Sequence, residues 1–147
     1  ELFSYIAFDF EKEMNIDISS IAKQYELTSS QIIHIDKGRF RCTEVLFQPS
    51  LFDIKGEGIH NMIQKSIMKC CTNIQDDLFN NITLIGGSTA IPGLDERLIK
   101  ELKILNPNVA NIRIQQIPSR QRQQAVWLGG VNLISSPNFR SKFISKN

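Results

Sequence analysis

The sequence has no apolar run that approaches the roughly 18 residues needed for a membrane-spanning helix. Its first residues also lack the basic flank and the apolar stretch of a secretory signal. A net charge of only +2 over 147 residues does not suggest the strongly basic surface of a nucleic-acid-binding domain. We therefore expect neither a membrane partner nor direct contact with nucleic acid. The chain begins with Glu1 instead of Met, and we expect it to be an excised segment of a longer protein.

Cysteine is scarce and occurs in an odd number, as Cys42, Cys70 and Cys71. A disulfide between adjacent residues is strained, and any single pairing leaves one thiol over. We interpret the three as reduced, structural thiols, which are typical of the cytosol or nucleus. Two adjacent thiolates cannot readily bind one zinc ion, and the sequence contains no second pair, so we expect no metal site.

The hydrophobic pattern predicts helices alternating with short strands, and 41% apolar residues are enough for a sizeable core. Apolar residues at spacings of three and four predict helices over residues 5–14, 59–70, 74–79, 94–105 and 125–134, with a short helix or turn over 139–146. Short apolar or alternating runs predict strands over residues 32–35, 39–41, 82–85 and 112–114. Gly38 is expected to supply the positive φ of the turn between the first two strands. Residues 51–58 and 118–124 are expected to be loops.

A pair of glycines follows the third predicted strand and carries the strongest local signal for a binding site. Gly86 and Gly87 have no Cβ, so a flat or charged ligand can lie directly against their backbone. Ser88 and Thr89 come next, where amides at a turn favour an anion and where ligands commonly bind off strand ends. A tight strand-to-helix turn with a capping hydroxyl explains the same residues without any ligand. Spacing alone leaves both interpretations open.

The remaining polar candidates have simpler interpretations. His34 and His60 have no Cys or acid nearby at ligand spacing, so we expect structural histidines with satisfied hydrogen bonds. A solvated basic face or a basic contact surface would account for four cations near the C-terminus: Arg120, Arg122, Arg140 and Lys142. No Ser-His-acid or Cys-His arrangement lies in a recognisable motif, so we predict no catalytic residue in this chain.

Five segments resemble known families. Residues 84–93 resemble the adenosine motif shared by actins, Hsp70 chaperones and sugar kinases. Residues 5–14, 39–50, 58–60 with 66–70, and 125–130 with 143–146 are similar to actin blocks, in the actin order and over essentially the whole chain. The chain is therefore identified as a member of the actin and actin-related family, with an Hsp70-like ATPase fragment as a weaker alternative. The resemblance implies an α/β chain that forms part of the actin-like (ribonuclease H-like) ATPase fold, an incomplete sheet with flanking helices.

The resemblance also implies where this chain lies in an actin. Residues 1–57 correspond to the later part of subdomain 4, residues 58–124 to the core of subdomain 3, and residues 125–147 to the segment re-entering subdomain 1. Actins bind ATP or ADP with magnesium between two lobes, and their two phosphate hairpins and magnesium-organising acid precede the matched region. We therefore expect Gly86, Gly87 and Ser88 to lie on the adenosine side of the nucleotide, and Glu1 to lie near the ribose hydroxyls. We expect no ATPase activity and only weak ATP binding from this chain by itself.

Two departures from the actin pattern bear on nucleotide affinity. Actins place a Met-Tyr pair where this chain has Ala90 and Ile91, and a Lys-Tyr pair where it has Gln123 and Gln124. An aromatic contact or a cation over a ring is worth about 1 kcal/mol each. Their loss is expected to weaken nucleotide binding.

Two further departures bear on partners. The loop over residues 51–58 resembles the hydrophobic plug between actin filament strands, but Asp53 and Lys55 make it more polar. The region 133–143 resembles the cleft that receives helical partners, and its added polar residues make it a poorer site for an amphipathic helix. Two functions stay open: a cytoskeletal actin-like ATP-binding protein of the cytoplasm, or a non-polymerising structural subunit of a chromatin-remodelling or nucleating complex, possible also in the nucleus. The partners implied are other actin-like subunits, actin-binding proteins or a multi-subunit complex.

Overall fold

A computed structural model describes residues 3–27, 31–137 and 139 of the chain. The chain divides into two compact units: Glu1–Ile82 with Ile91–Gln115, and Thr83–Ala90 with Gln116–Asn147. Glu1, which is expected near the ribose, lies outside the described residues, as does all of the predicted tail element at 139–146 except Phe139. No helix among the described residues is both long and apolar enough to cross a membrane.

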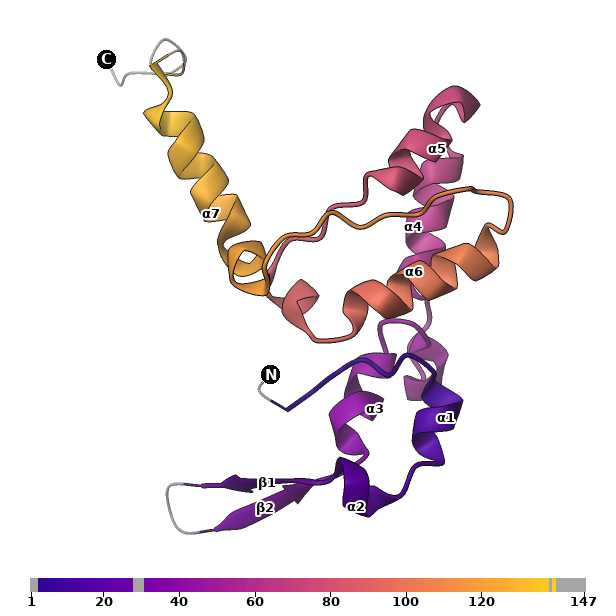
Figure 1. Cartoon of the computed structure of the whole chain (residues 1–147), viewed down its shortest axis with the longest axis vertical. Coiled ribbons are helices and arrows are strands. Elements are labelled where there is room, and N and C mark those ends of the chain that lie inside the picture. Colours follow the sequence, from indigo (N-terminus) through magenta and orange to yellow (C-terminus); the bar gives the residue numbers. More distant parts are fainter. Residues whose placement is uncertain (1–2, 28–30, 138, 140–147) are drawn as a thin grey trace. The chain divides into compact units, whose positions relative to one another are not determined.

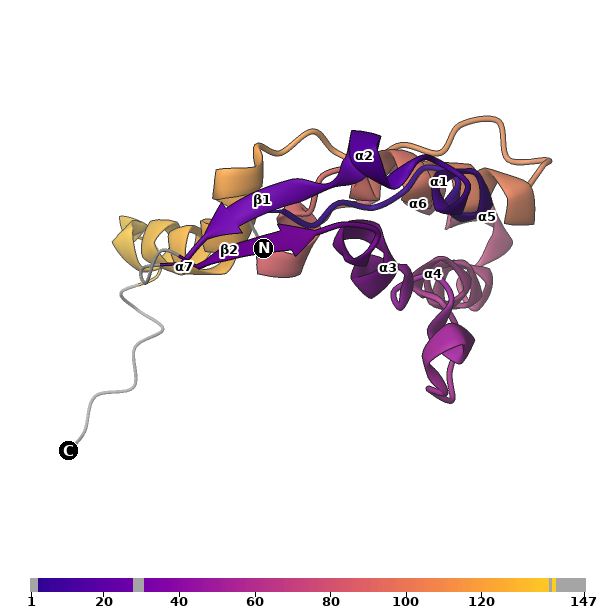
Figure 2. The same cartoon turned by 90° about the horizontal axis from the view of Figure 1, so that it is seen from below.

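The first unit consists mainly of helices, with one small sheet (Figure 1). Its helices are α1 (Phe10–Met14), α2 (Ile18–Ile21), α3 (Gly38–Glu44), α4 (Ile59–Met68), α5 (Thr72–Asn80) and α6 (Leu94–Leu105), with a 3₁₀ turn η1 (Pro49–Phe52). Strands β1 (Lys23–Glu26) and β2 (Ile32–Ile35) pair antiparallel, with Lys23 opposite Ile35 and Glu26 opposite Ile32. Figure 2 shows the two strands side by side. Helices combined with a small sheet agree with the predicted α/β class.

Short helices in this unit begin at capping side chains. Asp9 accepts a hydrogen bond from the amide of Lys12 at the start of α1. Asp17 does the same for the amide of Ser19 at the start of α2. Such caps satisfy amides that have no partner inside the helix. The capping side chains therefore determine where α1 and α2 begin, although neither helix is long enough to be stable alone.

The core of the first unit gathers around two groups of apolar side chains. Phe40 of α3 is fully buried, and the rings of Tyr5 and Phe10 lie 5.8 and 5.9 Å from it. The second group consists of buried residues on and around α6: Leu94, Leu98, Leu102, Phe79, Ile112 and Ile114. The predicted core face of α6 also included Ile99 and Leu105, which are only half-buried. Burial of each large apolar side chain contributes roughly 1.5–3 kcal/mol relative to exposure. The prediction of α6, including its bounds, is confirmed.

Three predictions near the N-terminus are wrong in type or in extent. Residues 39–41 belong to helix α3 and not to a strand, because Phe40, Thr43 and Glu44 are buried together at helical spacing. Gly38 is the first residue of that helix and has no positive φ, so β2 pairs instead with the upstream strand β1. The predicted helix 5–14 begins only at Phe10, because the preceding segment is extended and Tyr5 donates its amide to the carbonyl of Arg39, at 3.1 Å.

The predicted strands 82–85 and 112–114 are reduced to one isolated parallel bridge between Ile82 and Ile114. The amide of Ile82 donates to Arg113 at 3.1 Å, and that of Gln115 donates to Ile82 at 2.8 Å. Ile85 is 50% exposed, so the expected buried strand before the glycines is wrong. The expected alternation around Arg113 is present, with both neighbouring isoleucines buried.

Other helix predictions hold in type and shift in extent. Helix α4 ends at Met68, two residues before the predicted end, and the expected core residues Met62 and Cys70 are exposed. Helix α5 includes the predicted residues 74–79. Chain length and periodicity therefore located these helices, but their buried faces are narrower than the pattern suggested.

The second unit contains the 3₁₀ turn η2 (Gly87–Ala90) and helix α7 (Ser119–Ser135). The predicted helix 125–134 is part of α7, but the predicted loop 118–124 is wrong, because Ser119 starts the helix and Pro118 precedes it at the N-cap. Proline suits the start of a helix because the N–H that it lacks would have no partner within the helix.

Candidate functional site

The turn at Gly86 to Thr89 is closed by hydrogen bonds within the second unit. Gly86 has a φ of +99°, a conformation that side-chain-bearing residues rarely adopt. Its carbonyl accepts from the amide of Thr89 at 3.2 Å and from Thr89 Oγ1 at 2.7 Å. The first glycine of the pair is therefore required by backbone geometry, and Thr89 stabilises the bend that it makes.

Open space lies beside both glycines of this turn. A Cβ added at Gly86 or Gly87 would meet no heavy atom within 4 Å. At Gly93, in contrast, an added Cβ would overlap the carbonyl oxygen of Ile6. Gly87 and Ser88 are exposed, and Gly86 is half-buried. The bare backbone is thus accessible to a flat group in a way that the backbone of Gly93 is not.

The amides of the turn are only partly available. Gly86 donates its amide to the carbonyl of Arg122 at 2.8 Å, and Thr89 donates to Gly86. The expectation of several outward-facing amides is therefore narrowed to those of Gly87 and Ser88. Two neighbouring amides next to an exposed hydroxyl can still donate to a polar or anionic group.

Arg122 holds this turn against α7. Its side chain is buried, with Nη1 2.9 Å from the carbonyl oxygen of Thr89 and Nε 2.8 Å from that of Ile117. The prediction of a solvated or partner-binding basic surface is wrong for Arg122, whereas Arg120 is exposed. The error follows from the predicted loop: once residues 119–124 form a helix, Arg122 lies on the side that meets η2. Arg140 and Lys142 lie outside the described residues.

Comparison with known proteins adds the decisive observation. The family model described as Actin matches residues 1–147, which is the whole chain. This chain belongs to the actin family. A relative named actin-29, from Dictyostelium discoideum, is 34% identical over 150 residues. That match covers 99% of this chain and 39% of the relative, so this actin-family chain spans well under half of the relative's length.

Family membership raises the question of whether the glycine turn fits a nucleotide. The open backbone at Gly86 and Gly87 is the kind of surface on which a planar base or ribose can lie without a side chain in the way. Ser88 is exposed next to it and offers a hydroxyl that both donates and accepts. The turn therefore fits one side of an adenosine. Among the described residues, no group of three or more His, Cys, Asp or Glu side chains could hold a metal ion.

A buried ion-pair network lies in the first unit of this actin-family chain. Glu44 accepts from Arg97 at 2.9 Å, and Arg97 Nε donates to Glu101 at 2.6 Å. Arg97 also donates to the carbonyl of Ala7 at 2.7 Å and lies 4.8 Å from the ring centre of Phe47. Only the i,i+4 spacing of Arg97 and Glu101 was visible in the sequence, because Glu44 comes from a distant segment. The network joins α3 to α6.

Beside this network, His60 is only partly satisfied. Its Nε2 lies 3.1 Å from Asn61 Nδ2, but its buried Nδ1 has no hydrogen-bond partner among the described residues. Burial lowers the pKa of His60, and the nearby Arg97 adds to that effect while Glu101 and Glu44 oppose it. The expectation of a fully satisfied structural histidine is therefore wrong for His60.

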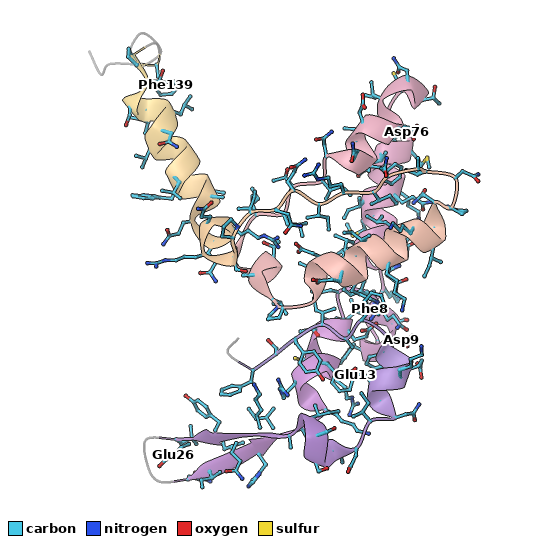
Figure 3. The ribbon with its side chains drawn as sticks, viewed as in Figure 1. Phe8, Asp9, Glu13, Glu26, Asp76 and Phe139 are labelled. Carbon is cyan, nitrogen blue, oxygen red and sulfur yellow. The ribbon has the colours of Figure 1, made fainter. Side chains whose placement is uncertain are left out.

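A further set of contacts joins the N-terminal segment to α6. Lys100 Nζ lies 4.8 Å from the ring centre of Phe8 and 3.6 Å from Asp9 Oδ2. Figure 3 labels Phe8 and Asp9 next to each other at this place.

The three cysteines, Cys42, Cys70 and Cys71, are free thiols and all are exposed.

Proposed function

We propose that this actin-family chain supplies the adenosine-facing side of a cleft that binds ATP or ADP. The observation that supports this proposal most is the open, side-chain-free backbone at Gly86 and Gly87. A base or ribose edge would approach these two residues, and Ser88 would offer its hydroxyl and amide. Glu1 is proposed to lie near the ribose hydroxyls, a role that comes from the resemblance to actins alone.

Phosphate and magnesium binding is proposed to depend on residues outside this chain. The chain spans 39% of the length of actin-29, and the described residues offer no metal-binding group. Magnesium bound with ATP would offset the phosphate charge through oxygen ligands. We propose that the subdomain division at residues 57 and 124 applies here, so that residues 58–124 supply the glycine turn, and that hydrolysis is not a property of this chain by itself.

Blocking the open backbone tests the nucleotide proposal. Gly87→Val places a branched side chain in the free space and is expected to weaken ATP binding by the full-length protein about tenfold or more, a loss of about 1.4 kcal/mol per factor of ten. The matched control is Gly38→Val, because an added Cβ at Gly38 also meets nothing within 4 Å. Isothermal titration calorimetry gives the affinities, and thermal unfolding checks that both variants fold. Equal ATP affinity in the two variants would count against the proposal.

Surface chemistry supports a role in assembly. Leu51, Phe52 and Ile54 are 54, 42 and 50% exposed on one loop, and such apolar side chains close together suit contact with a partner. The partners proposed are other actin-like subunits or actin-binding proteins, in the cytoplasm and its cytoskeleton.

A second candidate function rests on the charges in the same loop. Asp53, in the left-handed conformation with φ of 55°, and Lys55 interrupt the apolar surface. A mixed surface of this kind favours a structural subunit of a larger assembly, such as a non-polymerising actin-related protein in a chromatin-remodelling or nucleating complex, over a filament. Sedimentation under polymerising salt separates the two: a pellet supports the cytoskeletal function, and a soluble protein that copurifies with a large complex supports the subunit. Fractionation of cells into nucleus and cytoplasm tests the nuclear location proposed with the chromatin-remodelling alternative.

A further inference from the structure

Arg122 contacts both ends of the glycine turn. Its carbonyl oxygen accepts the Gly86 amide at 2.8 Å, and its Nη1 donates to the Thr89 carbonyl at 2.9 Å. The third contact, from Nε to Ile117 at 2.8 Å, fixes the guanidinium against the segment that leads into α7. One buried residue thus joins the beginning and the end of the four-residue bend to a long helix.

We infer that Arg122 is the positioning residue of this turn, holding the backbone of Gly86 to Thr89 in the one shape that exposes it to a ligand. The choice of ligand, the adenosine part of ATP or ADP, rests on the proposed function. Arg122 is only 6% exposed, and its Nη1 and Nε donate to carbonyls of the chain. It therefore acts on a nucleotide only through the turn.

The glycines explain why the turn needs such a residue. Glycine reaches positive and negative φ with similar ease, so two in succession allow many backbone shapes. The bond from Thr89 Oγ1 to Gly86 lies inside the turn and cannot orient it relative to α7. A guanidinium presents its donors in a fixed planar arrangement, and hydrogen bonds from a charged donor are stronger than neutral ones. Arg122 can therefore select one shape out of many.

Selection of one shape has a consequence for affinity. When the binding-competent shape is only fractionally populated, the apparent dissociation constant rises by the inverse of that fraction. A turn that is competent about a tenth of the time would bind its ligand about tenfold more weakly. Loss of Arg122 is thus expected to weaken nucleotide binding without removing any atom that touches the nucleotide.

The test uses three variants of the protein at its full natural length. Arg122→Gln removes the charge and the fork, Arg122→Lys keeps the charge with one donor group, and Arg120→Gln changes the exposed arginine one half-turn earlier in α7. Two measurements are made on each: amide hydrogen exchange of residues 86–90 without nucleotide, and the ATP dissociation constant by calorimetry. Thermal unfolding confirms folding, and the Lys variant keeps the test valid if Arg122→Gln does not fold.

We expect the effects of the three variants on exchange and on ATP affinity to differ in size. Exchange over residues 86–90 should rise about tenfold in Arg122→Gln, the ATP dissociation constant should rise by a similar factor, and Arg122→Lys should recover part of both. Arg120→Gln should match the unmodified protein. Unchanged exchange in Arg122→Gln and Arg122→Lys would overturn the inference. Faster exchange with unchanged ATP affinity would overturn the link from turn shape to ligand.

The two proposals fail in different ways. Should the unmodified full-length protein bind neither ATP nor ADP, the proposed function fails, and the exchange measurement still decides whether Arg122 shapes the turn. Should ATP bind and Gly87→Val abolish binding while the Arg122 variants change nothing, the proposed function stands and the positioning role falls.

Discussion

Nη2 of Arg97 lies 2.9 Å from Oε1 of Glu44, and the two side chains are only 5% and 1% exposed. Neither charge can be left alone at such burial, because an unpaired buried ion loses its hydration without compensation. The pair therefore links α6 to α3, and this contact is stable only when both charged side chains are present. The same guanidinium also donates to the Ala7 carbonyl and to Glu101.

Arg97→Met is expected to destabilise the protein by about 3–5 kcal/mol, because it leaves the Glu44 carboxylate buried and unpaired. The control is Lys65→Met, which breaks the ion pair of Lys65 with Glu57, where the side chains are 61% and 47% exposed. Exposed pairs contribute about 0–1 kcal/mol. Urea denaturation followed by circular dichroism measures both, and losses of equal size would contradict the argument.

Gly93→Ala is expected to cost about 1–3 kcal/mol. Gly93 has a φ of +88°, and its added Cβ would overlap the carbonyl oxygen of Ile6. That carbonyl belongs to a segment held in place by the bond from the Ile6 amide to Pro92, at 2.8 Å, so it cannot move aside freely.

The matched substitution for Gly93 is Gly129→Ala. Gly129 lies inside α7 with nothing within 4 Å of an added Cβ, and alanine there is expected to stabilise by about 0.5–1 kcal/mol. Thermal unfolding compares the two variants. A stabilised Gly93→Ala protein would show that the bend before α6 differs from the one described.

Tyr5→Phe is expected to flatten the alkaline limb of the stability profile. The hydroxyl of Tyr5 donates to Glu13 at 2.6 Å, and burial, together with this hydrogen bond, raises the pKa of Tyr5 from 10.0 to about 12. The neutral phenol is therefore favoured in the folded state. Its contribution to the free energy of unfolding is complete below pH 10.0 and is lost as the pH rises to about 12.

Urea unfolding at a series of alkaline pH values measures this effect in the unmodified protein and in Tyr5→Phe. At neutral pH the variant should also lose about 1 kcal/mol for the missing hydrogen bond. Identical alkaline slopes in the two proteins would assign the effect to other groups.

His60→Gln is expected to reduce the acid sensitivity of the protein. Burial lowers the pKa of His60 in the folded state from its ordinary value of 6.5. As the pH falls below 6.5, His60 becomes protonated in the unfolded chain but stays neutral in the folded chain, so the free energy of unfolding decreases. This decrease ends once the pH passes below the folded-state pKa.

Chemical denaturation between neutral and mildly acid pH follows the difference. The free energy of unfolding should depend less steeply on pH in His60→Gln. The difference in slope should correspond to the uptake of at most one proton on unfolding. Arg97, Glu44 and Glu101 stay in place in this variant, so their contribution to the slope is common to both proteins. An unchanged slope in His60→Gln would show that folding does not lower the pKa of His60.

Helices α6 and α3 mark the limits of what the pattern of residues could predict. Leu94, Leu98 and Leu102 recur at a spacing of four, and this periodicity predicted α6 with its bounds because a helix depends on neighbours along the chain. Residues 39–41 alternate in a way that also fits a strand, and the burial of Phe40 on a helix was decided by contacts with the segment around Tyr5.

Membership of the actin family, the helix of residues 94–105 and the glycine pair could all be read from the order of the amino acids, since motifs and helical periodicity are local. Folding alone established that open space adjoins Gly86 and Gly87 and that Arg122 is buried behind them, while Arg120 stays in solvent. The physical reason is that burial and hydrogen-bond partners depend on which distant segments meet. Arg122 and Thr89 are 33 positions apart, and no spacing rule links residues at that separation.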